Sequence, residues 1–129
     1  MTEQADIFES PLNQARELKQ RRKYAEAERL LTAALRERPG DNKLRASLAD
    51  LFYRSDRRKE ALKLAGEILR DDPHDPRALV VLGNVLYEKK QYREALEYFQ
   101  LATDIAPTDY LWARAAHCHL KLKQPAPAL

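Results

Sequence analysis

The sequence predicts an all-α fold built from paired helices, and three observations support this prediction. Only 3 of the 129 residues are glycine, whereas 44% are hydrophobic and 33% are charged, a mixture typical of exposed helices with narrow apolar stripes. Prolines recur at intervals of 34 residues, as Pro39, Pro73 and Pro107. Small residues recur at fixed distances before each of these prolines. A unit of this length that keeps its small residues in register indicates stacked helical repeats.

The small residues occupy three places in each 34-residue repeat. They lie 24, 12 and 5 residues before the prolines, and the nine residues are Ala15, Ala49 and Gly83, then Ala27, Ala61 and Ala95, then Ala34, Ile68 and Ala102. Eight of these nine are Ala or Gly. Helices that cross at close distance need a side chain without bulk at the contact. We therefore expect these places to lie where the helices of one repeat cross.

Each 34-residue repeat is predicted to contain a first helix, a short polar turn and a second helix. Turn segments such as "SDRR" at 55–58 and "KKQY" at 89–92 separate the two helices. The proline ends the second helix because it has no amide donor with which to continue it. We therefore divide the chain into an N-terminal tail at 1–7, repeats at 8–41, 42–75 and 76–108, and a partial fourth repeat or capping helix at 109–129.

The partial fourth repeat begins after Pro107. A frame shift of one residue puts Trp112 at its fourth place, Ala116 at its small eighth place and Ala128 at its small twentieth place. Pro125 and Pro127 then fall near the first turn of a second helix, where proline is tolerated. The frame predicts a first helix and almost none of the second. We therefore expect Trp112 and Leu120 to form an exposed association surface.

The chain resembles the tetratricopeptide-repeat (TPR) family, most clearly in "LVVLGNVLYEKKQYREALEYFQLATDIAP" at 79–107. The resemblance runs from about residue 8 onward, with Gln14 where the family prefers Leu and Arg58 where it prefers an aromatic residue. It implies a right-handed superhelix, an α-solenoid of three helix-turn-helix repeats plus a partial fourth. The first helix of each repeat would line the concave face.

The resemblance also implies a peptide-binding groove on that concave face. Its expected residues are Arg16, Asp50, Tyr53, Arg54, Arg77, Val80, Val81, Asn84, Tyr87, Arg114 and His117. Basic residues outnumber acidic ones along the full lining, and Val and Tyr side chains lie near its middle. This pattern predicts a scaffold, adaptor or chaperone-like module that binds an extended protein segment with apolar anchors and acidic residues. The alternatives are a solvated helix face without a ligand, and a structural segment of a larger protein that docks or forms a homodimer through its C-terminal end.

A second resemblance concerns residues 44–129, which are similar to the helical-repeat chaperones of type III secretion translocators. It includes Tyr53, the corner from Asp75 to Arg77 and a Cys-x-Leu-x-Leu segment that ends at Leu122. It implies a bacterial chaperone that holds a proline-flanked apolar segment. The clamp with which other members of the family grip a terminal carboxylate is not assembled, because its places hold Leu12, Arg16, Ser47, Arg77 and Val81.

The sequence argues against an enzyme, a cofactor and a metal site. It has no glycine-rich phosphate loop, and the aspartates Asp71, Asp72 and Asp75 lie at a repeat corner, where Asp commonly caps a helix. His117 and His119 are two residues apart, so on a helix their side chains diverge by roughly 200° and cannot share one ion. We expect His117 to face the groove, His119 to pack inward and Cys118 to be a small apolar filler.

Charge and hydropathy bear on nucleic acid, membrane and location. The 23 basic residues exceed the 20 acidic ones by too little to predict nucleic-acid binding. No apolar run approaches the ~18 residues of a membrane span, which argues against membrane insertion. The N-terminal segment lacks the basic and apolar regions of a signal peptide. We therefore expect a cytoplasmic protein.

Overall fold

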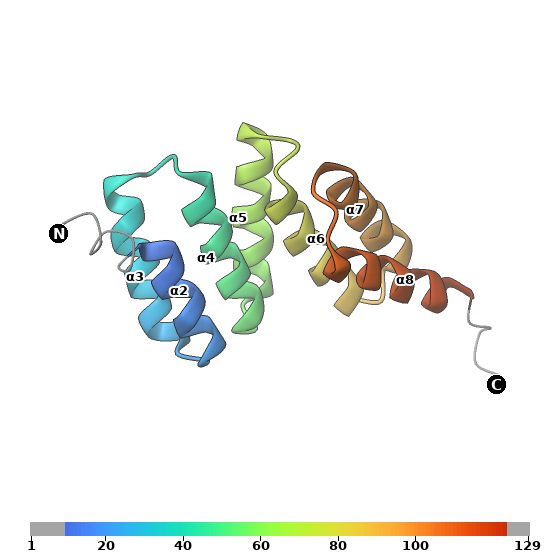
Figure 1. The fold of residues 1–129 in the computed structure, drawn as a ribbon, viewed down its shortest axis with the longest axis horizontal. Coiled ribbons are helices and arrows are strands. Elements are labelled where there is room, and N and C mark those ends of the chain that lie inside the picture. Colours follow the sequence, from blue (N-terminus) through green and yellow to red (C-terminus); the bar gives the residue numbers. More distant parts are fainter. Residues whose placement is uncertain (1–9, 124–129) are drawn as a thin grey trace. The chain divides into compact units, whose positions relative to one another are not determined.

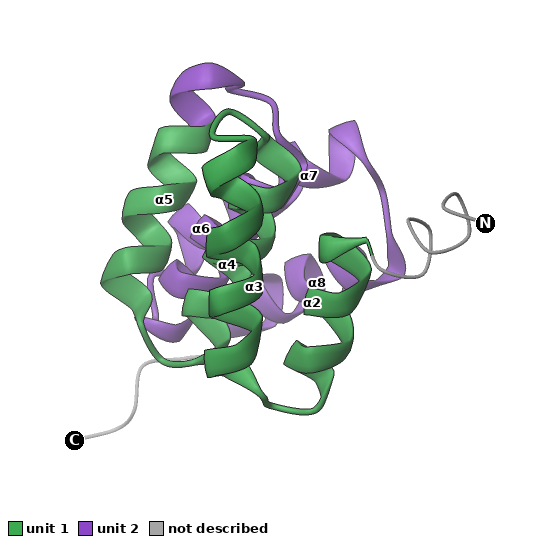
Figure 2. Ribbon diagram, turned by 90° about the vertical axis from the view of Figure 1, so that its left-hand side faces the viewer, with its two compact units in different colours: residues 1–68 green, residues 69–129 purple. Residues whose placement is uncertain are grey.

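The computed structural model describes residues 10–123, and within this range it contains seven helices and no strand (Figure 1). The helices are α2 (Pro11–Gln20), α3 (Tyr24–Glu37), α4 (Asn42–Arg54), α5 (Arg58–Asp71), α6 (Pro76–Glu88), α7 (Tyr92–Ile105) and α8 (Asp109–Lys123). The predicted all-α fold is confirmed. The chain divides into two compact units, residues 1–68 (unit 1) and 69–129 (unit 2), and α5 runs across the boundary (Figure 2).

The helix ends follow from local sequence. The second helices α3, α5 and α7 each end two residues before a repeat proline, at Glu37, Asp71 and Ile105. The first helices that follow are capped by a side-chain oxygen. Asp41 and Asp75 accept backbone N–H groups at the start of α4 and α6, and Thr108 accepts the N–H of Leu111 at 3.2 Å in α8. These caps satisfy N–H groups that have no partner within the helix.

The turns inside the repeats are alike. Arg22, Asp56 and Lys90 each have a positive φ, at 61°, 68° and 65°, and they occupy the same place in successive repeats. In each turn the following N–H donates to a carbonyl five residues earlier, as from Lys23 to Leu18 at 2.8 Å. This is the Schellman arrangement that ends a helix, and it is formed here without glycine.

Unit 1 is built around alanines. Helix α2 packs against α3 and α4, and α3 packs against α4. The small residues Ala15, Ala27 and Ala49 have no exposed surface, as predicted for the places where helices cross. Leu31 and Ile68 are also fully buried and supply bulk to the core.

Unit 2 places a glycine against an aromatic ring. A Cβ atom at Gly83 in α6 would lie 2.6 Å from Cε1 of Phe99 in α7, closer than real contacts allow. Phe99 is fully buried, together with Ala95 and Ala102 of the same helix. Gly83 therefore allows the ring of Phe99 to reach the backbone of α6.

Helix α8 packs against α7 through one face, which includes Leu111, Ala115 and the fully buried Cys118. Cys118 is thus an apolar filler as predicted, and burial raises the pKa of its thiol although the charge of Arg114 opposes this. His119 was expected to pack inward, and this was wrong because it lies on the exposed side of α8. Ala128, Pro125 and Pro127, to which the sequence assigned a second helix, lie outside the described residues.

No helix between residues 10 and 123 is both long and apolar enough to cross a membrane.

Candidate functional site

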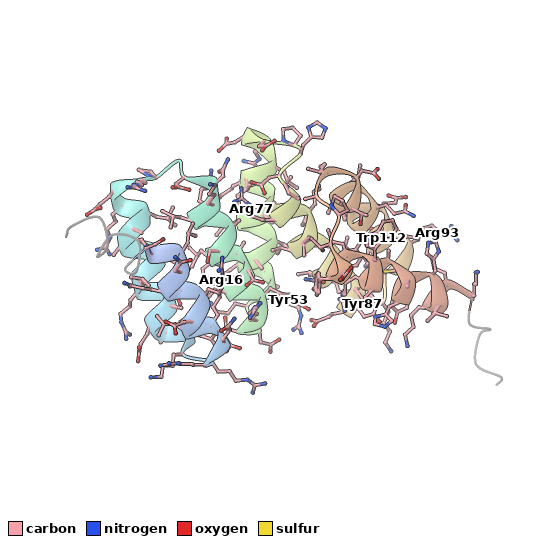
Figure 3. The ribbon with its side chains drawn as sticks, in the orientation of Figure 1. Arg16, Tyr53, Arg77, Tyr87, Arg93 and Trp112 are labelled. Carbon is pink, nitrogen blue, oxygen red and sulfur yellow. The ribbon has the colours of Figure 1, made fainter. Side chains whose placement is uncertain are left out.

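The residues predicted for the groove fall into two groups, one in each unit. Unit 1 holds Arg16, Asp50, Tyr53 and Arg54, and unit 2 holds Arg77, Val80, Val81, Asn84, Tyr87, Arg114 and His117. Figure 3 labels four of them, Arg16 on α2, Tyr53 on α4 and Arg77 and Tyr87 on α6. Within unit 1 the structure brings Asp50 and Arg54 together, and within unit 2 it brings Asn84, Tyr87 and Arg114 together.

Asp50 in unit 1 is neutralised by cations of its own unit. Its Oδ2 accepts from Nζ of Lys19 at 3.0 Å and forms an ion pair with Nε of Arg54 at 2.9 Å. Lys19 is only 9% exposed and also donates to the side chain of Ser47 at 3.1 Å. These bonds link α2 to α4, so the Asp50 carboxylate already has two cationic partners inside the protein.

A second cation of unit 1, Arg57, is also held by carboxylates. Its guanidinium lies over the ring of Phe52, 4.4 Å from the centroid. Its Nη1 donates to Glu28 at 2.5 Å, and its Nη2 and Nε donate to Glu60 at 2.6 and 2.8 Å. The hydrogen bonds from Glu60 and then Glu28 raise the pKa of Arg57, and Arg57 in turn lowers the pKa of Glu60. The Nε, Nη1 and Nη2 groups of this guanidinium therefore all have carboxylate partners within unit 1.

Unit 2 contains a polar cluster that we call the Arg114 site, formed by Asn84, Tyr87, Tyr110 and Arg114. Asn84 is only 4% exposed, and its Oδ1 accepts from the hydroxyl of Tyr110 and from Nε of Arg114, both at 3.1 Å. One buried amide of α6 thus positions two side chains of α8. Because a buried acceptor without a partner is costly, these bonds favour a single arrangement of the cluster.

The Arg114 guanidinium is stacked on aromatic rings. It lies 4.3 Å from the centroid of Tyr87, 5.5 Å from that of Phe99 and 6.0 Å from that of Tyr110. Tyr87 is supported by an edge contact with Tyr92 at 5.3 Å. Arg114 is half-buried, and none of the carboxylates between residues 10 and 123 lies within ion-pair distance of it. Its two Nη groups are left without a hydrogen-bond partner in the described part of the chain.

The imidazole of His117 and the cationic side chain of Lys121 follow Arg114 along α8. His117 and Lys121 are three and seven residues later, so they share one side of the helix with Arg114, and both are exposed. This side of α8 is therefore a favourable environment for a negatively charged group.

The other predicted residues of unit 2 are held in different ways. Arg77 donates from Nε and Nη2 to the Asp75 carboxylate at 3.1 and 2.9 Å. Burial disfavours ionisation of Asp75, but the hydrogen bonds and charge of Arg77 outweigh it and hold its pKa below the ordinary value. Val80 is half-buried against the core of unit 2, and Val81 is only 3% exposed. Asp75 acts as a helix cap, as the sequence predicted for this corner.

The sequence prediction of the groove did not include Lys19, Arg57 or Tyr110. The partners of Lys19 and Tyr110 lie 31 and 26 residues away, in the neighbouring first helix. Repeat spacing could have suggested these pairs, because first helices of successive repeats lie near each other in such a fold. The choice of partner depends on side-chain geometry, which the repeat frame does not contain.

The cluster offers hydrogen-bond donors and aromatic surface. Among residues 10–123, no three His, Cys, Asp or Glu side chains gather closely enough to hold a metal ion. A guanidinium with open Nη groups can donate two parallel bonds to a carboxylate or phosphate. The arrangement thus suits recognition of an anionic group.

Comparison with known families identifies the repeats. The family model described as tetratricopeptide repeat matches residues 12–65 and 47–110, which together span more than half of the chain. No curated protein sequence matches.

Solved structures with similar folds agree with this match. The Sgt2 TPR domain from Aspergillus fumigatus has a TM-score of 0.75 at 19% identity, covering 94% of this chain and 87% of its own. The TPR domain of P58(IPK) has a TM-score of 0.75 at 17% identity, covering 95% and 35%. The structure of pilF from Pseudomonas aeruginosa has a TM-score of 0.78 at 24% identity, covering 92% and 55%. At these identities the structures show the fold alone, which confirms the predicted solenoid class.

Proposed function

Because the chain belongs to the tetratricopeptide-repeat family, whose members are generally non-catalytic protein-interaction modules, we propose that it binds an extended segment of a partner protein and seats an acidic side chain of that segment at the Arg114 site. Adaptor and chaperone-like roles both fit this mode of binding. The observation that supports the proposal most strongly is the stacked Arg114 guanidinium, which has no carboxylate partner among residues 10–123.

Arg57 shows how this protein uses a guanidinium held over an aromatic ring. There the Nε, Nη1 and Nη2 groups are all occupied by two glutamates. At Arg114 the ring and the Nε bond are present, and the glutamates are not. An acidic residue of the partner supplies the missing carboxylate, and Lys121 attracts further negative charge.

The residues of the Arg114 site have different roles under this proposal. Arg114 contacts the ligand, whereas Asn84 positions Arg114 and Tyr110, because its carbonyl oxygen is already bonded to both. Tyr87 supplies the surface on which the guanidinium lies and an edge for apolar parts of the ligand.

Selection from a random peptide display library tests the proposal. We expect enriched peptides to carry Asp or Glu beside apolar residues. Arg114→Gln should weaken their binding by about tenfold or more, because a charged hydrogen-bonded pair contributes about 1.5–3 kcal/mol. Arg93→Gln is the matched control, since Arg93 is an exposed arginine of α7 in the same unit. Enriched peptides without acidic residues, or equal binding by the Arg114→Gln protein, would contradict the proposal.

A double-mutant cycle identifies the bond itself. The peptide's acidic residue is changed to its amide in combination with Arg114→Gln, and we expect the two effects not to add. Arg114→Lys keeps the charge but loses the planar fork, so it should recover only part of the affinity. Full recovery of peptide affinity would indicate that the site recognises the ligand through positive charge alone.

A narrower version follows from the resemblance of residues 44–129 to translocator chaperones. The bound segment would then be apolar and flanked by prolines, and the chain would keep a secretion substrate soluble before export. Co-expression of a translocator from the same genome tests this, with soluble complex as the expected result. A genome without secretion or translocator genes near the coding sequence would exclude this version and leave the general proposal in place.

A further inference from the structure

Helix α8 carries an exposed stripe on a side that the Arg114 site does not use. The stripe consists of Asp109, Trp112, Ala116, Leu120 and Lys123, at spacings of three, four, four and three residues that keep them on one side of a helix. Trp112 and Leu120 are each 61% exposed. Trp112 and Arg114 are two residues apart and so point about 200° away from each other. We call these five residues the α8 stripe.

A hollow lies beside the stripe. Trp112, Ala115, Ala116 and His119 of α8 border it together with Gln100, Thr103 and Asp104 of α7, and its volume is about 440 Å³. In the preceding repeat the corresponding fourth and eighth places, Leu79 and Gly83 of α6, are buried, and Phe99 of α7 lies directly against Gly83. None of the residues 10–123 covers the same places of α8 in this way. This side of α8 is thus of the kind that the fold covers with another helix.

The charges of the stripe favour one occupant. Its acidic residue, Asp109, is in the first turn of α8, and its basic residue, Lys123, is in the last turn. A second α8 laid antiparallel about Ala116 would bring Asp109 to Lys123 and Trp112 to Leu120, because each pair is equidistant from Ala116 in the sequence. A parallel arrangement would place like charges together and is disfavoured.

We propose that the α8 stripe pairs with the same stripe of a second copy in an antiparallel, two-fold symmetric contact. Such a contact is self-complementary, since each residue meets its counterpart twice. The small Ala116 side chains meet at the axis and allow the helices to approach closely, while each Trp112 covers the partner copy's Leu120. The contact buries apolar surface that is exposed in one copy.

Sedimentation across a concentration series tests this pairing. We expect the dimer fraction to rise with concentration, and Trp112→Asp to abolish it without loss of helix content, because Trp112 is largely exposed in one copy. A chain that is monomeric throughout, or a dimer that Trp112→Asp leaves unchanged, would overturn the proposal.

A charge exchange tests the antiparallel direction. Asp109→Lys and Lys123→Asp should each weaken the dimer by about fivefold, since exposed ion pairs are individually modest and this one occurs twice. The double exchange restores opposite charges in the antiparallel contact, so the dimer should recover. Failure of the double exchange to recover affinity, with helix content unchanged, would contradict this direction.

Cross-linking tests the register independently. In a Cys118→Ala background, Ala116→Cys should form an intermolecular disulfide on mild oxidation because the two side chains meet at the axis. Lys121→Cys is the control, because Lys121 is also exposed but lies on the side of α8 that carries Arg114. Equal cross-linking by both variants would overturn the register. The peptide-binding proposal uses the other side of α8, so Trp112→Asp should leave peptide affinity unchanged and the two proposals can fail separately.

Discussion

The two units each contain an arginine stacked on an aromatic ring, and the two arginines differ in what surrounds the rest of the guanidinium. Arg57 in unit 1 lies 4.4 Å from the Phe52 centroid and is bonded to two glutamates. Arg114 in unit 2 lies 4.3 Å from the Tyr87 centroid and is bonded to a neutral amide. The distance from the guanidinium to the nearest ring is similar in the two units, but the glutamates that bind Arg57 have no counterpart beside Arg114 among residues 10–123.

Under our proposal, the difference separates an arginine that stabilises the fold from an arginine that binds a ligand. In unit 1 the charges join helices: Lys19 of α2 reaches Asp50 of α4, and Arg57 reaches Glu28 of α3. In unit 2 the described helices are joined by packing around Phe99 and by the neutral acceptor Asn84. A guanidinium that is held in place without a counter-ion is prepared for a carboxylate from outside. The following predictions test this contrast.

The largest expected effect concerns the core of unit 2. Gly83→Val should destabilise the protein by about 1–3 kcal/mol, because the added atoms have no room beside the Phe99 ring. Thermal or urea unfolding followed by circular dichroism measures this loss. Gly66→Ala in α5 is the control, since no atom lies within 4 Å of the added Cβ, and it should stabilise by up to about 1 kcal/mol. Equal effects of the two changes would show that the core of unit 2 is not tightly packed at this point.

The next effect concerns the cap of α6. Asp75→Ala should cost about 1–2 kcal/mol of unfolding free energy, because Asp75 accepts the Arg77 N–H at 3.0 Å and is almost fully buried. The pKa of Asp75 is lower in the folded chain than in the unfolded chain. Its stabilising contribution is therefore complete above the unfolded pKa and is lost as the pH falls through the folded pKa. Urea unfolding between pH 7 and pH 2 measures this contribution. As the pH falls, the Asp75→Asn protein should lose less unfolding free energy than the unchanged protein, because it has no carboxylate to protonate at this position. Parallel pH profiles of the two proteins would contradict this.

A smaller effect distinguishes the two stacked arginines. Arg57→Met should lower stability by about 0.5–1 kcal/mol at low ionic strength, as exposed ion pairs do, and the loss should shrink in 1 M salt because salt screens surface charges. Arg114→Met should show a loss of stability that does not depend on salt, because Arg114 has no described ion pair. Urea unfolding at two salt concentrations measures both. A salt-dependent loss in Arg114→Met would reveal a carboxylate partner and contradict the contrast between the units.

The smallest effect is expected at the left-handed turn positions, which occur in both units. Lys90→Gly should stabilise by about 0.5 kcal/mol, because Lys90 has φ 65° and a left-handed backbone disfavours residues with a Cβ. Asp56→Gly in unit 1, at φ 68°, should gain less, since Asp tolerates this region better than Lys. Unfolding experiments should show this order, and a loss of stability in both variants would contradict it.

The fold could be predicted from the sequence because its determinants recur. The prolines stop α3, α5 and α7, and small residues such as Ala15, Ala49 and Gly83 are buried where helices cross. Both signals repeat every 34 residues, so each repeat confirms the others. The inward position assigned to His119 was wrong, because α8 packs against the core of unit 2 through Leu111, Ala115 and Cys118 and leaves His119 exposed.

The candidate site could be predicted only in part. The repeat frame assigned Asn84, Tyr87 and Arg114 to the same predicted groove, and the structure places them in contact. The frame did not distinguish Asp50, which is bonded within unit 1, from a residue open to a partner. Whether a charge is used internally depends on the side chain opposite it, and the local sequence pattern does not describe that side chain.

The most direct test of the contrast is an NMR titration of the arginine Nε–Hε groups with N-acetylglutamate methylamide, using N-acetylglutamine methylamide as the uncharged control. We predict that the carboxylate compound shifts the Arg114 signal in a saturable manner and leaves that of Arg57 in place, and that the amide compound shifts neither. An Arg114 signal that does not respond, or equal responses of Arg57 and Arg114, would contradict the proposal that unit 2 presents an open carboxylate site.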